Sequence, residues 1–413
     1  MRHTNQIPTP APGEEVEWVR QHLGALTAEG RDGVVASTAF RGGQAAADRA
    51  LATLDITGYA RARNEVWPPQ RRGASRLSPY IRYGLITLPD VWHAVADASS
   101  SDRTKYRDEL MWQEYARHVY ARLGPELGRS LRHEPPSVVP MADPWNDDMA
   151  CMSLVTAELE RDGWLVNQTR MWLASQWTVR GGRDWRQGED RFFTHLLDGS
   201  RAANRVGWQW TVGTGTGKPY GFSRWQVRKR APGLCGTCAL RHACPVEDWP
   251  DAQPGPTVAP PERLRHDRDP ATTAGPSTAR ISGDPDAVWL TFESLGDADP
   301  ALSALSALPA VVVFDVPLLA RLRLSGKRLV FLAETIADLA TRRVVEVYAG
   351  DPVEVLVGRP VAVTYAPVPG FGRRARAIAP VQVHPWPWLI RPGSGSLASF
   401  TAWRRSGEGG RSG

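Results

Sequence analysis

Residues 163–210 of the 413-residue chain read GWLVNQTRMWLASQWTVRGGRDWRQGEDRFFTHLLDGSRAANRVGWQW. Six of the seventeen tryptophans of the chain lie in this stretch, among short polar residues that an ordinary core helix seldom carries. Glu189 to Leu197 predicts an amphipathic helix that Asp198-Gly199-Ser200 ends. Asp198 and Asn204 could press polar groups against a flat cofactor, or they could cap two helices whose tryptophans fill a core. From the residues alone, we favour the second interpretation, in which Asp198 and Asn204 cap helices and the tryptophans fill a core.

Composition and charge argue against a membrane or secreted protein but do not identify a function. No apolar run of about 18 residues is present, which argues against a membrane span. The N-terminus lacks the apolar segment of a secretory signal, so we expect a cytoplasmic protein. We also expect a monomer. A net charge of +6 and a pI near 9.3 are compatible with a polyanionic partner, but many basic proteins bind no polyanion, so the charge does not decide between the two. A local basic patch at Arg224, Arg228, Lys229 and Arg230 could follow phosphates.

The first 250 residues carry helical patterns. Apolar periodicity predicts helices near residues 16–26, 40–59, 87–97, 105–123 and 149–162, and through most of 163–197. Residues 251–286 are rich in Pro, Ala and Thr with few large apolar side chains, which is typical of a linker. The sequence thus predicts an all-helical domain over residues 1–250 and a linker over 251–286.

Residues 287–413 change to a β-α-β pattern. The apolar runs AVWLTF, AVVVFDV, VVEVY and PVAVTY are separated by turn signals, and a helix over residues 327–342 lies between the second and third. Continuous β-branched runs with intervening helices indicate a buried parallel sheet. The fold class predicted for the chain is therefore α plus α/β, with a small Rossmann-like C-terminal domain.

Four segments resemble the cryptochrome/photolyase family, in the family's order. Residues 183–210 are similar to its flavin-binding core, whose pattern is D-W-R-x-G-E-x-x-F followed by L-x-D-G-D-x-A-x-N-x-G-x-W-Q-W. The other three are GASRLSPYIRYGLIT (73–87), RDELMWQEYARHVY (107–120) and GWLVNQTRM (163–171). The resemblance spans roughly residues 40–225 and implies a helical FAD-binding domain.

The resemblance also implies which residues hold the cofactor. FAD phosphates and sugar would lie at Tyr59, Ser75, Arg76, Leu77 and Ser78, where hydroxyls, backbone N–H groups and a helix start suit an anion. Asn167, Arg170, Asp198, Ser200 and Asn204 would face the FAD. Asn204 matches the residue beside flavin N5 in photolyases, a position where plant and insect cryptochromes tend to differ.

By the same resemblance, Glu109, Trp112 and Met171 would contact a pyrimidine dimer. The indole offers a stacking face to a base rotated out of the duplex, and the carboxylate can bond a thymine edge. The alternative from the residues is a helix with Trp112 in the core and Glu109 in solvent. Gln113 stands where the family usually has Arg.

The tryptophans divide into two groups under the resemblance. Trp208 and Trp185 match the inner members of the family's electron-transfer chain, and Trp145 is the expected third member. Trp164, Trp172, Trp177 and Trp210 are expected in the core. Ser200 replaces the second Asp of the family's D-G-D, which removes a carboxylate commonly used near the isoalloxazine.

Four cysteines suggest a metal centre. Cys235, Cys238 and Cys244 form a C-x2-C-x5-C run ending in Pro, and Cys151 lies far upstream. In a cytosolic protein this spacing favours metal over disulfides, with zinc on four thiolates as the generic choice. The arrangement also resembles the iron–sulfur bacterial cryptochromes and photolyases, which implies a [4Fe–4S] cluster. Val166 and Asn167 stand where that subgroup has a His-His pair. This difference argues against repair of (6-4) photoproducts and for repair of cyclobutane dimers.

The C-terminal domain resembles the family's N-terminal antenna domain. AVWLTFESLGDADPALSAL is similar to its opening strand and turn, and GKRLVFLAETIADLATRRVVEVYAGDPVEVL to its helix and next strand. We interpret this order as a circular permutation, with an unrelated Rossmann-like appendage as the alternative. Loops of the family's antenna domain are missing here, so the sequence does not decide whether an antenna chromophore binds.

The resemblance implies a light-driven lyase, a DNA photolyase. Electron transfer from reduced FAD would repair cyclobutane pyrimidine dimers in UV-damaged DNA. A cryptochrome-like blue-light photoreceptor without repair and a (6-4) photolyase are the alternatives.

Overall fold

The computed structural model describes residues 5–145, 147–250 and 254–406. The chain divides into two compact units, each assembled from three separate segments. The sheet unit comprises Met1–Leu54, Arg76–Ala94 and Asp267–Ser394. The helical unit comprises Asp55–Ser75, Val95–His266 and Gly395–Gly413. These units differ from the consecutive segments 1–250 and 287–413 that the sequence predicts.

A seven-stranded sheet with the order β1-β5-β4-β3-β6-β7-β2 forms the centre of the sheet unit. Its strands are β1 (Gln6–Ile7), β2 (Arg280–Ile281), β3 (Ala287–Leu290), β4 (Ala310–Asp315), β5 (Val345–Gly350), β6 (Val361–Thr364) and β7 (Gln382–His384). The five central strands are parallel and follow the order of a doubly wound fold. The predicted parallel sheet is nevertheless mixed, because β1 and β2 add antiparallel strands at its two edges.

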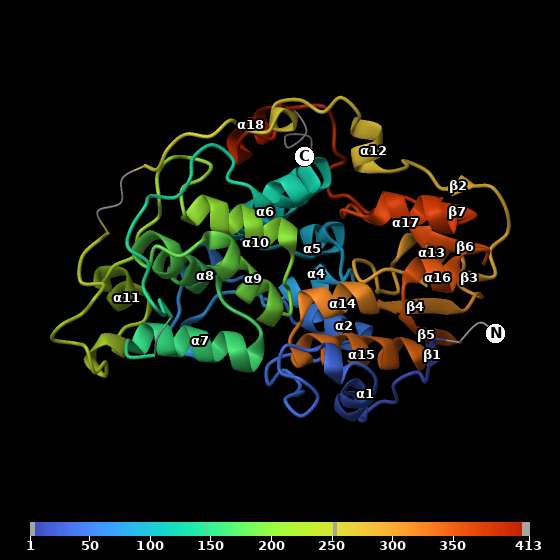
Figure 1. The fold of residues 1–413 in the computed structure, drawn as a ribbon, viewed down its shortest axis with the longest axis horizontal. Helices are drawn as coiled ribbons and strands as arrows, with labels where there is room; N and C mark the ends of the chain where they lie inside the picture. The colour runs from blue at the N-terminus through green and yellow to red at the C-terminus, as the bar shows by residue number, and fades with distance from the viewer. Residues whose placement is uncertain (1–4, 146, 251–253, 407–413) are drawn as a thin grey trace. The chain divides into compact units, whose positions relative to one another are not determined.

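Helices pack on this sheet because its central strands are apolar on both faces. The helices of the unit are α1 (Glu15–His22), α2 (Gln44–Ala52), α4 (Ser78–Arg82), α5 (Leu88–Ala94), α12 (Pro270–Ala274), α13 (Pro300–Ala304), α14 (Val316–Leu322), α15 (Gly326–Ala340), α16 (Pro352–Leu356) and α17 (Phe371–Ile378). Leu356 and Phe371 share a buried core with Trp289 and Val311. Within this unit, Figure 1 shows β1 beside β5, which joins the start of the chain to the sheet.

The N-terminal segment belongs to the sheet unit because α15 binds its backbone. Glu334 accepts hydrogen bonds from Gly42 N at 2.7 Å and from the Arg41 guanidinium at 2.6 Å. Thr335 Oγ1 accepts from Gly43 N at 3.0 Å. A Cβ at Gly42 would lie 2.1 Å from the carbonyl oxygen of Phe331, so only glycine permits this approach. These contacts join segments almost 300 residues apart, which a linear division of the sequence cannot anticipate.

Of the four segments that resemble the cryptochrome/photolyase family, residues 73–87 are divided between the units at Ser75 and Arg76, and the other three, residues 107–120, 163–171 and 183–210, lie in the helical unit. Its helices are α3 (Tyr59–Ala62), α6 (Ser100–Leu123), α7 (Ala150–Asp162), α8 (Asn167–Ala174), α9 (Trp185–His195), α10 (Arg201–Thr211), α11 (Arg224–Arg230) and α18 (Phe400–Arg405). The helix predicted over 105–123 begins five residues earlier, at Ser100, because Ser99 caps it by accepting a hydrogen bond from Asp102 N. None of the helices in the described ranges combines the length and apolarity that a membrane crossing needs.

The helix predicted through residues 163–197 is interrupted. α8 continues into a π-helical turn, Ser175–Arg180, and the chain then turns at Gly181 and Gly182 before α9. α9 approaches α10 closely at Gly188, where a Cβ would lie 2.2 Å from the Trp208 ring. The tryptophan-rich stretch is therefore three short helices packed on one another.

The predicted linker is divided between the two units at His266 and Asp267. Its first part is paired with the helical unit: Val258 N donates to Arg132 O at 2.7 Å, and Glu134 N donates to Pro256 O at 2.9 Å. Its second part holds α12 and the edge strand β2. The described part of this proline-rich segment therefore makes backbone hydrogen bonds and contains regular elements, unlike an extended linker.

Replacing Gly42 by Ala should destabilise the sheet unit by about 1–3 kcal/mol, because the new methyl group must displace backbone at Phe331. Gly372→Ala is the matched control, since a Cβ there meets only the end of Arg376 at 3.8 Å inside α17. Urea unfolding of both variants measures the difference. Equal stabilities would contradict the close approach at Gly42.

Candidate active site and cysteine cluster

Three of the residues predicted to face a flavin lie on α8, on α10 and on the turn that precedes α10. Arg170 Nη2 donates to Asp198 Oδ2 at 2.6 Å, and both side chains are largely buried. Asp198 Oδ1 and Asn204 Nδ2 are also buried, yet neither has a hydrogen-bond partner among the residues that the structure describes. A buried polar atom without a partner costs about 1–3 kcal/mol, so both atoms suit a polar ligand.

The turn that carries Asp198 is held by a buried carboxylate. Glu189 of α9 is 1% exposed and forms ion pairs with Arg201 and Arg205 of α10. Burial raises the pKa of Glu189, and the two arginines oppose that rise. Ser200 caps α10 by accepting from Ala202 N at 3.2 Å. The residue that departs from the family pattern therefore has a structural task in this chain.

The residues predicted to hold FAD phosphates are divided between the units. Tyr59 and Ser75 belong to the helical unit, whereas Arg76, Leu77 and Ser78 belong to the sheet unit. In the sheet unit, Leu77 is fully buried, Ser78 begins α4, and Arg76 adopts a left-handed backbone with φ of 59°.

In the helical unit, Tyr59 lies under α6. Its ring meets Tyr106 edge-on at 4.8 Å, and burial raises the pKa of both phenols, that of Tyr106 to about 12. Asp102 fixes the start of α3 by accepting from Gly58 N at 3.0 Å and Ala60 N at 2.8 Å. Asn167, predicted to face the flavin, is exposed at the start of α8.

Two predicted substrate contacts lie one turn apart on α6. Glu109 Oε1 is 3.1 Å from Arg63 Nε and 3.3 Å from Lys105 Nζ, and its side chain is 30% exposed. Trp112 is half-buried, and its ring stacks on Phe400 of α18 with centroids 4.5 Å apart and planes at 15°. Met171 of α8 is half-buried. Phe400 was not anticipated from the sequence; its only signal is a serine cap followed by aromatic residues at i and i+3 in SFTAW.

The buried tryptophans form a cluster between α9 and α10. Trp185 and Trp208 are almost fully buried, and their Nε1 atoms have no partner among the described residues. Trp145 lies 6.5 Å from Trp208 and 4.8 Å from Trp177, between ring centroids. Trp177 reaches the surface, where its Nε1 donates to Asp184 O at 2.9 Å. Trp145 thus connects Trp208 to a partly exposed indole.

The core assignment of two tryptophans needs correction. Trp164 and Trp172 are buried as predicted, and Trp177 is only half-buried. Trp210 is 42% exposed and contacts Tyr220 at 5.6 Å. The reason is its place on α10, where Trp208 takes the inward face and Trp210, two positions on, points away.

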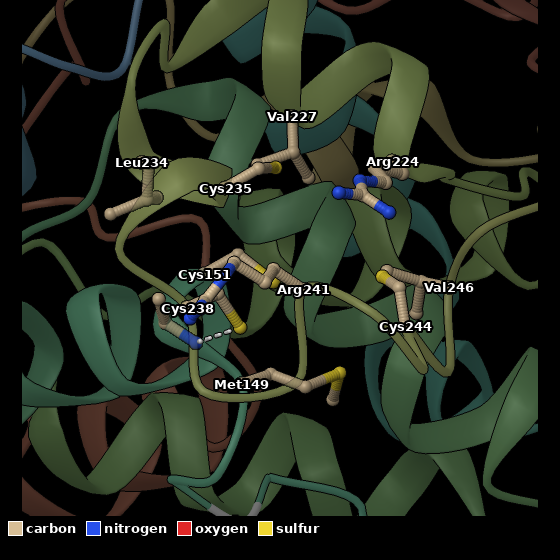
Figure 2. Close-up of a pocket in the computed structure, with 11 residues that line it drawn as sticks. Met149, Cys151, Arg224, Val227, Leu234, Cys235, Cys238, Arg241, Cys244 and Val246 are labelled. Atoms are coloured by element: carbon tan, nitrogen blue, oxygen red, sulfur yellow. Dashed lines mark hydrogen bonds between the residues drawn. The ribbon is translucent and has the colours of Figure 1, made fainter.

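All four cysteines line one pocket between the start of α7 and the loop after α11 (Figure 2). Cys151 is buried and the other three are half-buried. Ala150 N, at the first turn of α7, donates to Cys238 Sγ at 3.5 Å. Within the described ranges no group of three or more His, Cys, Asp or Glu side chains is arranged so that it could hold a metal ion, so the pocket brings the four cysteines together without placing them as ligands of one ion.

Cations surround this cysteine pocket. Arg224 and Arg241 line it, and Arg224 also pairs with Glu247 at 2.6 Å. Burial, and after it the neighbouring thiols, raise the pKa of Cys151 to about 12. Burial also raises the pKa of Cys235, and Arg224 opposes this rise. Burial thus favours the protonated thiols, and a metal bound here would have to displace their protons.

Residues 106–230 match the family described as the FAD binding domain of DNA photolyase. A deoxyribodipyrimidine photo-lyase of Vibrio cholerae is 32% identical over 170 residues, which are 37% of this chain and 36% of that protein. One of Thermus thermophilus is 32% identical over 182 residues, 40% and 41% of the two chains. A crystal structure of a bacterial class III photolyase from Agrobacterium tumefaciens is 26% identical, with a TM-score of 0.34 over 41% of this chain and 37% of that one. The chain thus covers less than half of each relative.

Replacing Ser200 by Ala removes the cap of α10 and should lower the free energy of unfolding by about 0.5–2 kcal/mol. Ser200→Asp restores an oxygen able to cap the helix and should stay within about 0.5 kcal/mol of the natural chain. Urea unfolding separates the two. A Ser200→Ala chain as stable as Ser200→Asp would exclude the capping role.

Proposed function

We propose that the protein is a light-driven flavoprotein that repairs cyclobutane pyrimidine dimers in DNA, on the premise that residues 106–230 match the FAD binding domain of DNA photolyase. The observation that carries the proposal is the pair of buried, unpartnered atoms, Asp198 Oδ1 and Asn204 Nδ2, described above. They lie in the family's flavin-binding motif, where a flavin ring would satisfy them.

The chain's contribution to cofactor binding is a pre-formed polar surface. Arg170 and Asp198 neutralise each other, so they present a hydrogen-bonding edge without adding net charge. Asn204 offers an amide that can donate to or accept from a flavin nitrogen, and therefore does not enforce one protonation state. Tyr59 and Ser75, beside Tyr106, would hold the polar chain of the cofactor.

A bound, reduced FAD would supply the light-driven electron transfer that opens the dimer. The residues of the chain orient and stabilise the reactants. Trp112 provides a flat face for a pyrimidine turned out of the helix, and Met171 would border it. Glu109, which pairs with Arg63 and Lys105, would accept a hydrogen bond from a thymine N–H. Arg228 and Lys229 of α11 would contact phosphates.

We also propose that Cys151, Cys235, Cys238 and Cys244 hold a [4Fe–4S] cluster. Support comes from the C-x2-C-x5-C-P spacing of the cysteines and from the one pocket that all four of them line. The Ala150 N–H and the nearby arginines would stabilise the negative charge of the thiolates. Such a cluster would join α7 to the loop that follows α11.

The sheet unit is proposed to correspond to the family's antenna-type domain in permuted order. Its parallel strands β3 to β7 follow one another along the C-terminal part of the chain. The edge strand β1 comes from the other end of the sequence. This order fits a permuted α/β domain better than an independent appendage, because both ends of the chain contribute to one sheet.

A photoreceptor without repair activity is the second candidate. The observation that favours it is the stacking of Phe400 on Trp112, which covers the face that repair requires. A photoreceptor has no need of an open base-stacking face.

Illumination of the reduced protein with oligonucleotides carrying a cyclobutane dimer or a (6-4) photoproduct tests the proposal, with restored thymines as the measurement. We expect repair of the cyclobutane dimer only. Glu109→Ala should weaken binding of this substrate by roughly ten- to a hundredfold while the flavin is retained, because one charged hydrogen bond is lost. Glu160→Ala, which removes an exposed pair with Arg191, is the control and should change nothing.

Absence of repair with either lesion would overturn the enzymatic proposal and leave the photoreceptor. Loss of flavin from Glu109→Ala would instead contradict the assignment of Glu109 to the substrate.

Metal analysis of protein purified without oxygen tests the cysteine site. We expect about four irons per chain and broad visible absorption, both lost in Cys238→Ser. One zinc per chain would replace the iron–sulfur proposal by a zinc site.

A further inference from the structure

The segment Gly395–Ser406, here called the C-terminal strap, is fastened along α6. Arg122 Nη1 donates to Gly395 O at 2.6 Å, and Tyr115 OH donates to Leu397 O at 2.9 Å. Arg132 Nη2 donates to Ala398 O at 2.6 Å. Figure 1 shows the end of the strap, α18, in red above α6. Three side chains of the helical unit thus hold the backbone that leads into α18.

α18 itself is held at its far end. Trp403 is fully buried, with its ring 5.6 Å from Tyr115 and 5.3 Å from His118. Arg404 Nη1 pairs with Asp108 at 2.8 Å on the surface. The fixed points of the strap therefore lie on both sides of Phe400.

Phe400 lies at the first position of α18 and is only half-buried. Its ring is nearly parallel to Trp112, as described above, and it meets Tyr115 edge-on at 5.7 Å. Stacked aromatic centroids 4.5 Å apart leave no room for a third ring. A base that stacks on this face of Trp112 must therefore displace Phe400.

We propose that the strap is an autoinhibitory cover whose Phe400 occupies the base-stacking face of Trp112 until damaged DNA displaces it. This inference rests on the proposed function, because it takes Trp112 as the residue that stacks on the lesion. The anchors at Gly395, Leu397 and Ala398 remain in place when Phe400 leaves, since they bind backbone that precedes it. The cover thus opens by a local change at the start of α18.

The consequence is a competition between an internal ring and a base. Intact duplex DNA offers no free pyrimidine to compete with Phe400, whereas a dimer is already unstacked in part and is turned out more readily. The cover would therefore lower affinity for DNA that presents an unstacked base, whereas intact duplex, which does not use this face, would be unaffected. Phe400 would in this sense set how tightly the lesion is bound.

The test measures binding of the full-length protein to a labelled single strand with one thymine dimer, by fluorescence anisotropy in the dark. Phe400→Ala should bind about two- to twelvefold more tightly, the range expected when one stacked aromatic pair is removed. Phe400→Leu, which keeps apolar contact with Tyr115 but loses the flat ring, should move in the same direction and guards against misfolding of the Ala variant. Trp249→Ala, an exposed indole outside the strap, is the control and should leave affinity unchanged.

Trp112→Ala and the double variant complete a thermodynamic cycle. The gain from Phe400→Ala should vanish in the Trp112→Ala background, because no stacking face is left to uncover. If the natural chain binds the dimer and neither Phe400 variant binds it more tightly, the cover is overturned; weaker binding would mean that Phe400 clamps the base from its other side. If no variant binds or repairs the dimer, the proposed function fails and the inference fails with it.

Discussion

The candidate active site depends on one buried carboxylate. Glu189 lies inside the helical unit and pairs with Arg201 and Arg205, so it ties α9 to α10 on either side of the turn at Asp198. Breaking a buried ion pair leaves an uncompensated charge and costs more than the pair contributes. The turn is therefore held in one conformation, and with it the unpartnered atoms of Asp198 and Asn204. Rigidity at this place is what a flat, polar ligand requires, because ordering the site in advance lowers the cost of binding.

Sequence patterns predicted the helices and strands whose own apolar residues recur at a regular spacing. The central strands β3 to β6 and the helices α6, α7 and α15 lie where the apolar spacing places them, because each buries a long, regular face. The edge strands β1 and β2 have two residues each, too few for any pattern, and their pairing depends on partners far along the chain. The same is true of Gly42, whose approach to α15 is a tertiary constraint. Domain boundaries were thus less predictable than elements.

The site shows a similar division. The motif around Asp198 and Asn204 predicts polar groups that face a flavin. The structure buries Asp198 Oδ1 and Asn204 Nδ2 without a partner among the described residues, and their contact with a flavin stays a prediction. Trp210 was assigned to the core because tryptophan is usually buried, but its position on α10 directs it outward. Phe400 could not be assigned at all, since its role comes from contact with a residue 288 positions away. Local chemistry was predictable, and the contacts that modify it were not.

Trp112 is the proposed base-stacking residue and also the residue on which Phe400 of the C-terminal strap stacks. An indole at the surface of α6 gains stability when something flat covers it, and in this chain Phe400 does so. The same physical preference that would hold a damaged base is therefore satisfied internally. Under the proposed function, the ease with which Phe400 leaves that face would decide how readily an unstacked pyrimidine replaces it. Because the anchors of the strap bind backbone before Phe400 and the Trp403 ring after it, the balance can be changed at position 400 without loosening the helical unit.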